Sequence, residues 1–225
     1  MTEEKANMGV IFDLDGVLID TALSHLKAWQ DLAAVEGFEM PEELFYSTFG
    51  MQNYQIIPQL VPDDTPREEI ERMSEWKEDR YRQIVVDQLV PADGVIQLLD
   101  DLKRTAFRLA VGSSAPRANV QLMLDTAGLM GHFDALVSGE DVSNGKPHPE
   151  TFTTAGGKLG LSPDRCVVVE DAAQGVEAGK AAGMAVVAVT STRKREELSR
   201  ADVIVDSLAE VNARDFMELI DSVAS

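Results

Sequence analysis

Short apolar runs rich in β-branched residues alternate with helix-length segments along most of this 225-residue chain. The runs are continuously apolar rather than alternating with polar residues, which is typical of strands in a parallel sheet covered on both faces. We therefore predict an α/β fold with a doubly wound, Rossmann-like parallel sheet. Pro116 and Pro149 each stand where the first residue of a following helix is expected. The expected strands are 8–14, 107–112, 135–139, 165–170, 185–189 and 202–205.

Residues 22 to about 88 interrupt this alternation, because they contain several helical segments and no convincing strand. An insertion directly after the first strand would stand above the carboxyl end of that strand, where ligands bind in doubly wound sheets. We therefore expect a Rossmann-like core formed by residues 1–20 and 90–225, and an all-helical cap formed by residues 21–89.

Acidic pairs end two of the predicted strands. The first apolar run stops at Asp13-Leu14-Asp15-Gly16, and the fourth ends at Glu170-Asp171. Taken alone, the first pair could equally be a helix cap or an Asx-turn instead of a functional site, and helix capping is the more ordinary explanation of the second. Because the carboxyl ends of parallel strands meet at one edge of the sheet, the two pairs together would form a hard-oxygen site suited to Mg²⁺.

Groups that bind anions are expected at the same edge. Ser113 and Ser114 follow the second run and precede a helix start, and Lys146 lies in a Gly-Lys-Pro turn after the third run. Taken singly, such residues are ordinarily helix caps and solvated surface charges. Taken together, the hydroxyls, the backbone N–H groups of the turn and the lysine would bind a dianion beside the metal.

These four motifs resemble, in order and spacing, those of the haloacid dehalogenase superfamily of phosphohydrolases, and the resemblance extends over nearly the whole chain. The motifs read DLDGV, VGSS, GKPHPE and VVVEDAAQGVEAGKAAG. The helical insertion, with DTALSHLKAW and EWKEDRY, is similar to the first-type cap of the β-phosphoglucomutase-like branch.

The resemblance implies a role for each matching position. Asp13 would be the nucleophile that forms an aspartyl-phosphate and would also bind the metal. Asp15 would be the general acid–base, with its backbone carbonyl on the metal. Protonated Asp15 at neutral pH needs a raised pKa, which a closed and partly dry site would supply. The remaining positions are the phosphate-binding Ser113, Ser114 and Lys146 and the metal ligands Glu170 and Asp171.

Four cap residues are candidates for substrate contact: His25, Gly50, Asn53 and Lys77. Without the resemblance, packing would explain His25, solvent exposure would explain Lys77, and a simple turn would explain Gly50. The β-phosphoglucomutase pattern has an arginine shortly after the glycine of the substrate loop, whereas the stretch FGMQN places Asn53 there. A second departure is Ala172, where the fourth motif commonly has serine.

The charge of the chain narrows the expected partners. It has 20 Lys plus Arg against 39 Asp plus Glu, a formal net charge of −19, which repels nucleic acid and anionic membranes. Its one cysteine, Cys166, opens an apolar run and is expected in the core, which fits a reducing compartment. No apolar run approaches the length of a membrane span. We therefore expect a cytoplasmic protein with no nucleic-acid or membrane partner, and its oligomeric state stays open.

The function expected from these features is that of a Mg²⁺-dependent phosphatase for a small phosphorylated metabolite, with a sugar phosphate favoured by the size of the cap. The alternative is a sugar-phosphate mutase of the β-phosphoglucomutase type. A receiver-type signalling module would be much shorter and would lack the cap, and a dehalogenase would need neither Asp15 nor the second acidic pair. Sugar, polyol, pyrophosphate and nucleotide substrates are not separated by these residues.

Overall fold

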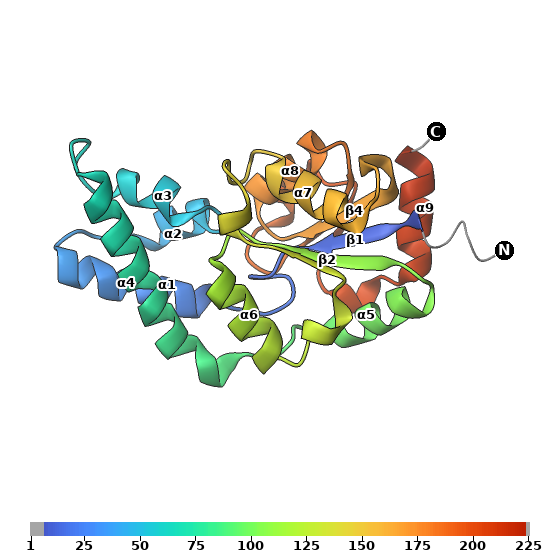
Figure 1. The fold of residues 1–225 in the computed structure, drawn as a ribbon, viewed down its shortest axis with the longest axis horizontal. Helices are drawn as coiled ribbons and strands as arrows, with labels where there is room; N and C mark the ends of the chain where they lie inside the picture. The colour runs from blue at the N-terminus through green and yellow to red at the C-terminus, as the bar shows by residue number, and fades with distance from the viewer. Residues whose placement is uncertain (1–6, 224–225) are drawn as a thin grey trace.

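The computed structural model describes residues 7–223, which form a sheet of six parallel strands with helices on both faces (Figure 1). The strand order is β3-β2-β1-β4-β5-β6. The predicted α/β fold with a doubly wound parallel sheet is confirmed, and every predicted strand is present. The strands are β1 Gly9–Phe12, β2 Arg108–Gly112, β3 Ala135–Val137, β4 Cys166–Glu170, β5 Ala185–Val189 and β6 Val203–Val205.

Helices pack on the two faces of the sheet. One face is covered by α5 Val95–Arg104, α6 Arg117–Thr126 and α9 Ala213–Val223, and the other by α7 Glu150–Leu159 and α8 Ala173–Ala181. Pro116 and Pro149 are N-cap residues, one position earlier than we predicted. Short 3₁₀ turns connect the elements at Met130–His132, Gly139–Asp141, Pro163–Arg165, Arg195–Leu198 and Leu208–Glu210.

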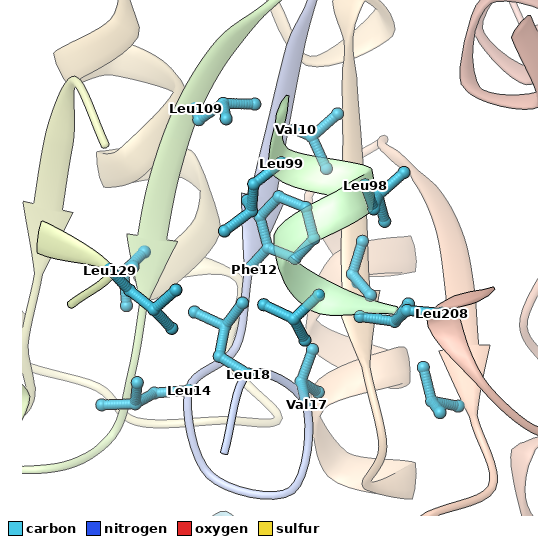
Figure 2. Close-up of a cluster of buried hydrophobic side chains, with 14 of the residues drawn as sticks. Val10, Phe12, Leu14, Val17, Leu18, Leu98, Leu99, Leu109, Leu129 and Leu208 are labelled. Atoms are coloured by element: carbon cyan, nitrogen blue, oxygen red, sulfur yellow. The ribbon is translucent and has the colours of Figure 1, made fainter. Parts of the chain in front are cut away.

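Strand β1 is the centre of the core, because it pairs with β2 on one side and with β4 on the other. Val10 and Phe12 pack against Leu98 and Leu99 of α5 on one face (Figure 2). Ile11 points to the opposite face and packs with residues of α7 and α8. Burial on both faces explains why this strand is continuously apolar in the sequence.

A helical insertion, defined here as residues 22–88, lies between β1 and the other strands in the sequence. It has its own apolar cluster, which includes Leu32, Phe45 and Ile57. Figure 1 shows these helices gathered at the end of the molecule away from α9. Its helices are α1 Ala22–Glu36, α2 Glu42–Thr48, α3 Asn53–Ile56 and α4 Arg67–Val85, with 3₁₀ turns at Ile57–Gln59 and Val86–Gln88.

Within residues 7–223, no helix combines the length and the apolar character needed to cross a lipid bilayer. We call the described residues outside the helical insertion the α/β core.

Candidate active site

The carboxyl ends of the central strands bring the predicted residues together. Asp13 follows β1, Ser113 follows β2 and Glu170 ends β4. The strand order changes direction between β1 and β4, which is where doubly wound sheets bind ligands. Asp13, Glu170 and Asp171 are buried and offer carboxylate oxygens that lie within 4.8 Å of one another. The two predicted acidic pairs therefore meet at one edge of the sheet.

Lys146 is the counter-charge of this acidic cluster. Its Nζ donates to Asp13 Oδ1 at 2.6 Å and to Glu170 Oε1 at 2.7 Å. Burial opposes a charged lysine, but the two carboxylates outweigh it and raise the pKa of Lys146. The buried charges are therefore paired, as buried charges must be to persist. An ammonium group has three protons, so one proton of Lys146 is not used by these two bonds.

The cluster still carries more negative than positive charge. Burial raises the pKa of Asp13 to about 7, with Glu170 and Asp15 adding to the effect and Lys146 offsetting part of it. Burial and Glu170 likewise raise the pKa of Asp171 well above its ordinary value. A divalent cation at this position would reverse both shifts, because it favours the ionised carboxylates. Three buried carboxylates that have only one lysine to balance them thus fit the hard cation Mg²⁺.

Two glycines make room for the carboxylates. A Cβ added at Gly16 would lie 2.1 Å from Asp171 Oδ2, and one added at Gly175 would lie 1.7 Å from Glu170 Oε1. Gly16 also has a φ of 82°, which side-chain-bearing residues rarely adopt. The second oxygen of Glu170 accepts the backbone N–H groups of Asp171 and Ala172, both at 2.8 Å. Ala172 therefore contributes its backbone to this edge although it lacks the hydroxyl of the common motif.

The Asp15 side chain has a different environment from that of Asp13. Its Oδ1 accepts the hydroxyl proton of Thr21 and lies 3.1 Å from Nε2 of His25. Burial raises the pKa of Asp15, but His25 and Thr21 outweigh it and the net pKa is lowered. Our expectation of a raised pKa is therefore wrong for this arrangement, because neighbouring donors stabilise the ionised form.

The two serines after β2 have different partners. The Oγ of Ser113 accepts the backbone N–H of Ala115 at 3.0 Å, so its own proton remains available for a phosphate oxygen. The hydroxyl of Ser114 instead donates to the carbonyl of Gly50 at 2.7 Å. Ser114 and Gly50 therefore connect the α/β core to the helical insertion.

A cavity of about 730 Å³ opens beside Asp13. Sites for small ligands are typically roughly 300–1,000 Å³, so its size suits a small metabolite. Lys146, Glu170 and Asp171 do not line this cavity but contact or adjoin Asp13, which does. The predicted residues that line it are Asp13, Asp15, His25, Gly50, Asn53, Lys77, Ser113 and Ser114.

His25 and Lys77 are neighbours in the wall formed by the helical insertion. The Nζ of Lys77 lies 2.8 Å from Nδ1 of His25 and donates to Glu78 Oε1 at 2.8 Å. The His25 ring stacks on Tyr81 with 3.8 Å between ring centroids. Asn53 donates to the same Glu78 oxygen at 2.7 Å. Three of the four candidates in the insertion, His25, Asn53 and Lys77, thus belong to one hydrogen-bonded group, whereas Gly50 does not.

Sequence reasoning missed four residues of this site: Thr21, Glu78, Asn119 and Thr192. Thr21 and Thr192 donate their hydroxyl protons to two of the predicted carboxylates, and Asn119 donates to Glu78 at 2.5 Å. Thr21 lies in the same motif as the first acidic pair, and Glu78 follows Lys77. Both could therefore have been considered because they lie close in sequence to predicted site residues. Asn119 and Thr192 had none, because only the fold brings them to their partners.

Comparisons with known proteins agree with this geometry. The model of the haloacid dehalogenase-like hydrolase family matches residues 10–189. The fructose-1-phosphate phosphatase of Escherichia coli is 31% identical over 78% of this chain and 93% of its own length. The validoxylamine A 7′-phosphate phosphatase of Streptomyces hygroscopicus subsp. limoneus is 32% identical over 89% of this chain and 94% of its own.

A solved structure shows the same fold. The β-phosphoglucomutase from Clostridium difficile superposes with a TM-score of 0.88 at 28% identity, covering 97% of this chain and 99% of that one. The resemblance inferred from the four motifs is therefore confirmed. Motifs, fold and relatives together show that this chain belongs to the haloacid dehalogenase-like hydrolase family.

Proposed function

We propose that this phosphoric monoester hydrolase is a Mg²⁺-dependent phosphatase that acts on small phosphorylated sugars or polyols through an aspartyl-phosphate on Asp13. The observation that supports it most is the buried group of Asp13, Lys146, Glu170 and Asp171 beside a cavity of about 730 Å³. Relatives are named for phosphatase activity on fructose 1-phosphate and validoxylamine A 7′-phosphate, which favours a hydroxylated substrate.

The proposed reaction uses the carboxylates of the first motif in two roles. An oxygen of Asp13 bonds to phosphorus while the bond from phosphorus to the alcohol oxygen breaks, and Asp15 gives that oxygen a proton. Asp15 then takes a proton from the water that cleaves the aspartyl-phosphate. Ser113 and the third proton of Lys146 donate to the phosphoryl oxygens. A phosphate dianion entering beside Asp15 would raise its pKa, so the substrate itself promotes the protonated form.

Asp13, Glu170 and Asp171 are the proposed metal-binding side chains, and the resemblance adds the backbone carbonyl of Asp15. Bound Mg²⁺ would neutralise the phosphate and so let a carboxylate approach phosphorus.

The division of the chain is part of the proposal. Residues 21–89 would act as a cap, and residues 1–20 with 90–225 as the catalytic core, with the small phosphorylated metabolite enclosed between them. Burial raises the pKa of the Cys166 thiol to about 12, which makes it an inert core residue. Together with the lack of a second cysteine, this favours the cytoplasm as the compartment.

A sugar-phosphate mutase is the second candidate, because a β-phosphoglucomutase is among the similar structures. A mutase must hold a bisphosphate, so the phosphate distant from Asp13 needs a cation. Asn53 offers neutral donors, and one of them is already bonded to Glu78. Among the described residues, the cations that line the cavity are Arg67, whose pair with Glu71 is exposed to solvent, and Lys77, which is buried against Glu78. Hydrolysis is therefore favoured.

A phosphate-release assay over a panel of sugar and polyol monophosphates tests the proposal. We expect release that requires Mg²⁺, stops on chelation and returns when Mg²⁺ is added back, since the acidic cluster needs a divalent cation before Asp13 can attack a dianion. Release that persists unchanged under strong chelation, or a panel with no substrate at all, would contradict it.

A further inference from the structure

Glu78 has no assigned role, yet its carboxylate is the meeting point of three structural elements. It accepts hydrogen bonds from Lys77 of α4, Asn53 of α3 and Asn119 of α6 at 2.8, 2.7 and 2.5 Å. It is only 5% exposed. Burial raises the pKa of Glu78, but Lys77 and the other donors outweigh it and the net pKa is lowered. A buried carboxylate with this many donors is held in one position.

Lys77 links Glu78 to the proposed general acid–base. A lysine ammonium has donors and no acceptor, so Nδ1 of His25, 2.8 Å from Lys77 Nζ, must accept. With Nδ1 accepting from Lys77, the ring proton that faces Asp15 lies on Nε2, which is 3.1 Å from Asp15 Oδ1. The hydrogen bonds therefore run in one direction, from Lys77 through His25 to Asp15. Glu78 holds the lysine at the start of this series.

Asn119 adds a contact from the α/β core. It is fully buried, its Nδ2 donates to Glu78, and its Oδ1 accepts from Arg82 at 2.6 Å. Lys77 and Glu78 belong to the helical insertion, whereas Asn119 belongs to the core. The position of Lys77 is therefore tied to the seating of the insertion on the core.

We propose that Glu78 is a positioning residue: seated on Asn119, it holds Lys77 and, through His25, the donor that faces Asp15. The proposal rests on the proposed function, because Asp15 is its general acid–base. It requires a negative charge at position 78, since a neutral side chain of the same shape would keep the contact with the core but would hold the lysine less firmly. A purely structural Glu78 would require only the contact.

Two phosphate esters separate these possibilities. Fructose 1-phosphate releases a basic alkoxide that needs a proton, whereas p-nitrophenyl phosphate releases a weakly basic phenolate that does not. The ratio kcat/KM reports the steps up to departure of the alcohol. For Glu78→Gln we expect kcat/KM to fall about tenfold or more with fructose 1-phosphate, the size of effect of one hydrogen bond to a charged group. With p-nitrophenyl phosphate we expect a change of less than about threefold.

An exchange of acid and amide provides the second variant. Asn119→Asp alone sets two carboxylates against each other and should lower the urea midpoint. Adding Glu78→Gln restores a hydrogen bond between an acid and an amide at the same contact. The negative charge then lies at position 119 of the core and no longer at position 78. We expect the double variant to regain the parent's urea midpoint and not its kcat/KM for fructose 1-phosphate. Recovery of both would show that the bond alone matters and would overturn the proposal.

Glu68→Gln is the matched control, since it makes the same change in α4 at an exposed residue that does not line the cavity. We expect it to keep the parent's kcat/KM for both esters. An equal loss in Glu68→Gln and Glu78→Gln would point to overall charge and would overturn the proposal, as would parental activity in folded Glu78→Gln.

A spectroscopic readout keeps the proposal testable whatever the activity. In ¹⁵N NMR of the histidines we expect His25 of the parent to show an unprotonated Nδ1, and its signal to move in Glu78→Gln while those of His132 and His148 stay in place. An unmoved His25 signal would overturn the inference. A parent enzyme that cleaves neither ester would instead count against the proposed function, with the NMR result still deciding the inference.

Discussion

Among single residues, Asp13 and Asp15 show how surroundings give two nearby carboxylates opposite properties. The pKa of Asp13 is raised to about 7, chiefly by burial, whereas donors from His25 and Thr21 lower that of Asp15 despite its burial. The proposed reaction needs the reverse, an ionised Asp13 and a protonated Asp15. A cation beside Asp13 and a dianion beside Asp15 would each push in the required direction. The ligands therefore complete the division of labour between the two groups.

Asp13→Asn tests the nucleophile. We expect phosphate release below about 1% of the parent rate, because an amide does not attack phosphorus. The fold should persist, since the Asn oxygen can still accept the donor of Lys146. Phosphate release is measured alongside urea unfolding of the same preparation. Release well above that level from a folded variant would remove Asp13 from the proposed role.

Gly175→Ala tests the placement of Glu170. The added methyl group would lie 1.7 Å from Glu170 Oε1, so the carboxylate must move. We expect the Mg²⁺ concentration for half-maximal activity to rise by about tenfold or more, as a loss of one ligand's alignment would cause. Gly157→Ala is the control, because its added Cβ would meet nothing within 4 Å beyond its chain neighbours and the backbone of its own helix. An unchanged Mg²⁺ requirement in Gly175→Ala would argue against Glu170 as a metal-binding residue.

Among the helices and strands, the elements that could be predicted from the sequence are those that depend on a local requirement. A strand buried on both faces needs a continuous apolar run, so β1, β4 and β5 were readable in the sequence. Within the insertion, helix α3 begins at Asn53 and changes to a 3₁₀ turn at Ile57. Pro58 lies in that turn and lacks the backbone N–H that a continuing α-helix uses.

The turn after β3 provides a prediction at this scale. Asp141 accepts the backbone N–H and the hydroxyl of Ser138, both at 2.8 Å. Burial opposes this, but Ser138 and Lys158 outweigh it and lower the pKa of Asp141 to about 2. A lowered pKa in the folded state stabilises the fold above the ordinary pKa of 3.8. That stabilisation is lost as the pH falls towards 2.

We therefore expect Asp141→Asn to lower the free energy of unfolding by about 2 kcal/mol at pH 7 and by about half as much at pH 3. Urea unfolding at the two pH values measures this difference. A destabilisation equal at both values would mean that the charge of Asp141 is not its source.

For the whole molecule, the strand ends allowed most of the candidate site to be predicted. Asp13, Ser113 and Glu170 follow or end strands, and a parallel sheet places all strand ends of one kind at one edge. The bonds of Asn119 to Glu78 and of Thr192 to Asp171 could not be predicted, because they join segments whose separation only the packed structure defines. The environment of Asp15 was misjudged although its partners Thr21 and His25 lie nearby in the sequence, because their bonds to the carboxylate depend on how the chain turns after β1.

The choice between phosphatase and mutase is also a property of the whole molecule. We expect β-glucose 1-phosphate, supplied with a trace of the 1,6-bisphosphate, to yield free phosphate with little glucose 6-phosphate. The reason is that a second phosphate would find no unpaired cation among the described residues of the cavity wall. Both products are followed in one time course. Glucose 6-phosphate forming much faster than phosphate would identify a mutase.

The pairing of β1 has a consequence for how the protein is made. Gly9 pairs with Arg108 on one side and with Cys166 on the other. As the chain leaves the ribosome, Val10, Ile11 and Phe12 must wait for both partner strands, and such long-range pairing is slow. An early-terminated chain that lacks β4 would leave β1 and the adjoining Asp13 at an open sheet edge, which invites aggregation. The acidic cluster is thus completed late in synthesis, because Glu170 and Asp171 lie far along the chain from Asp13.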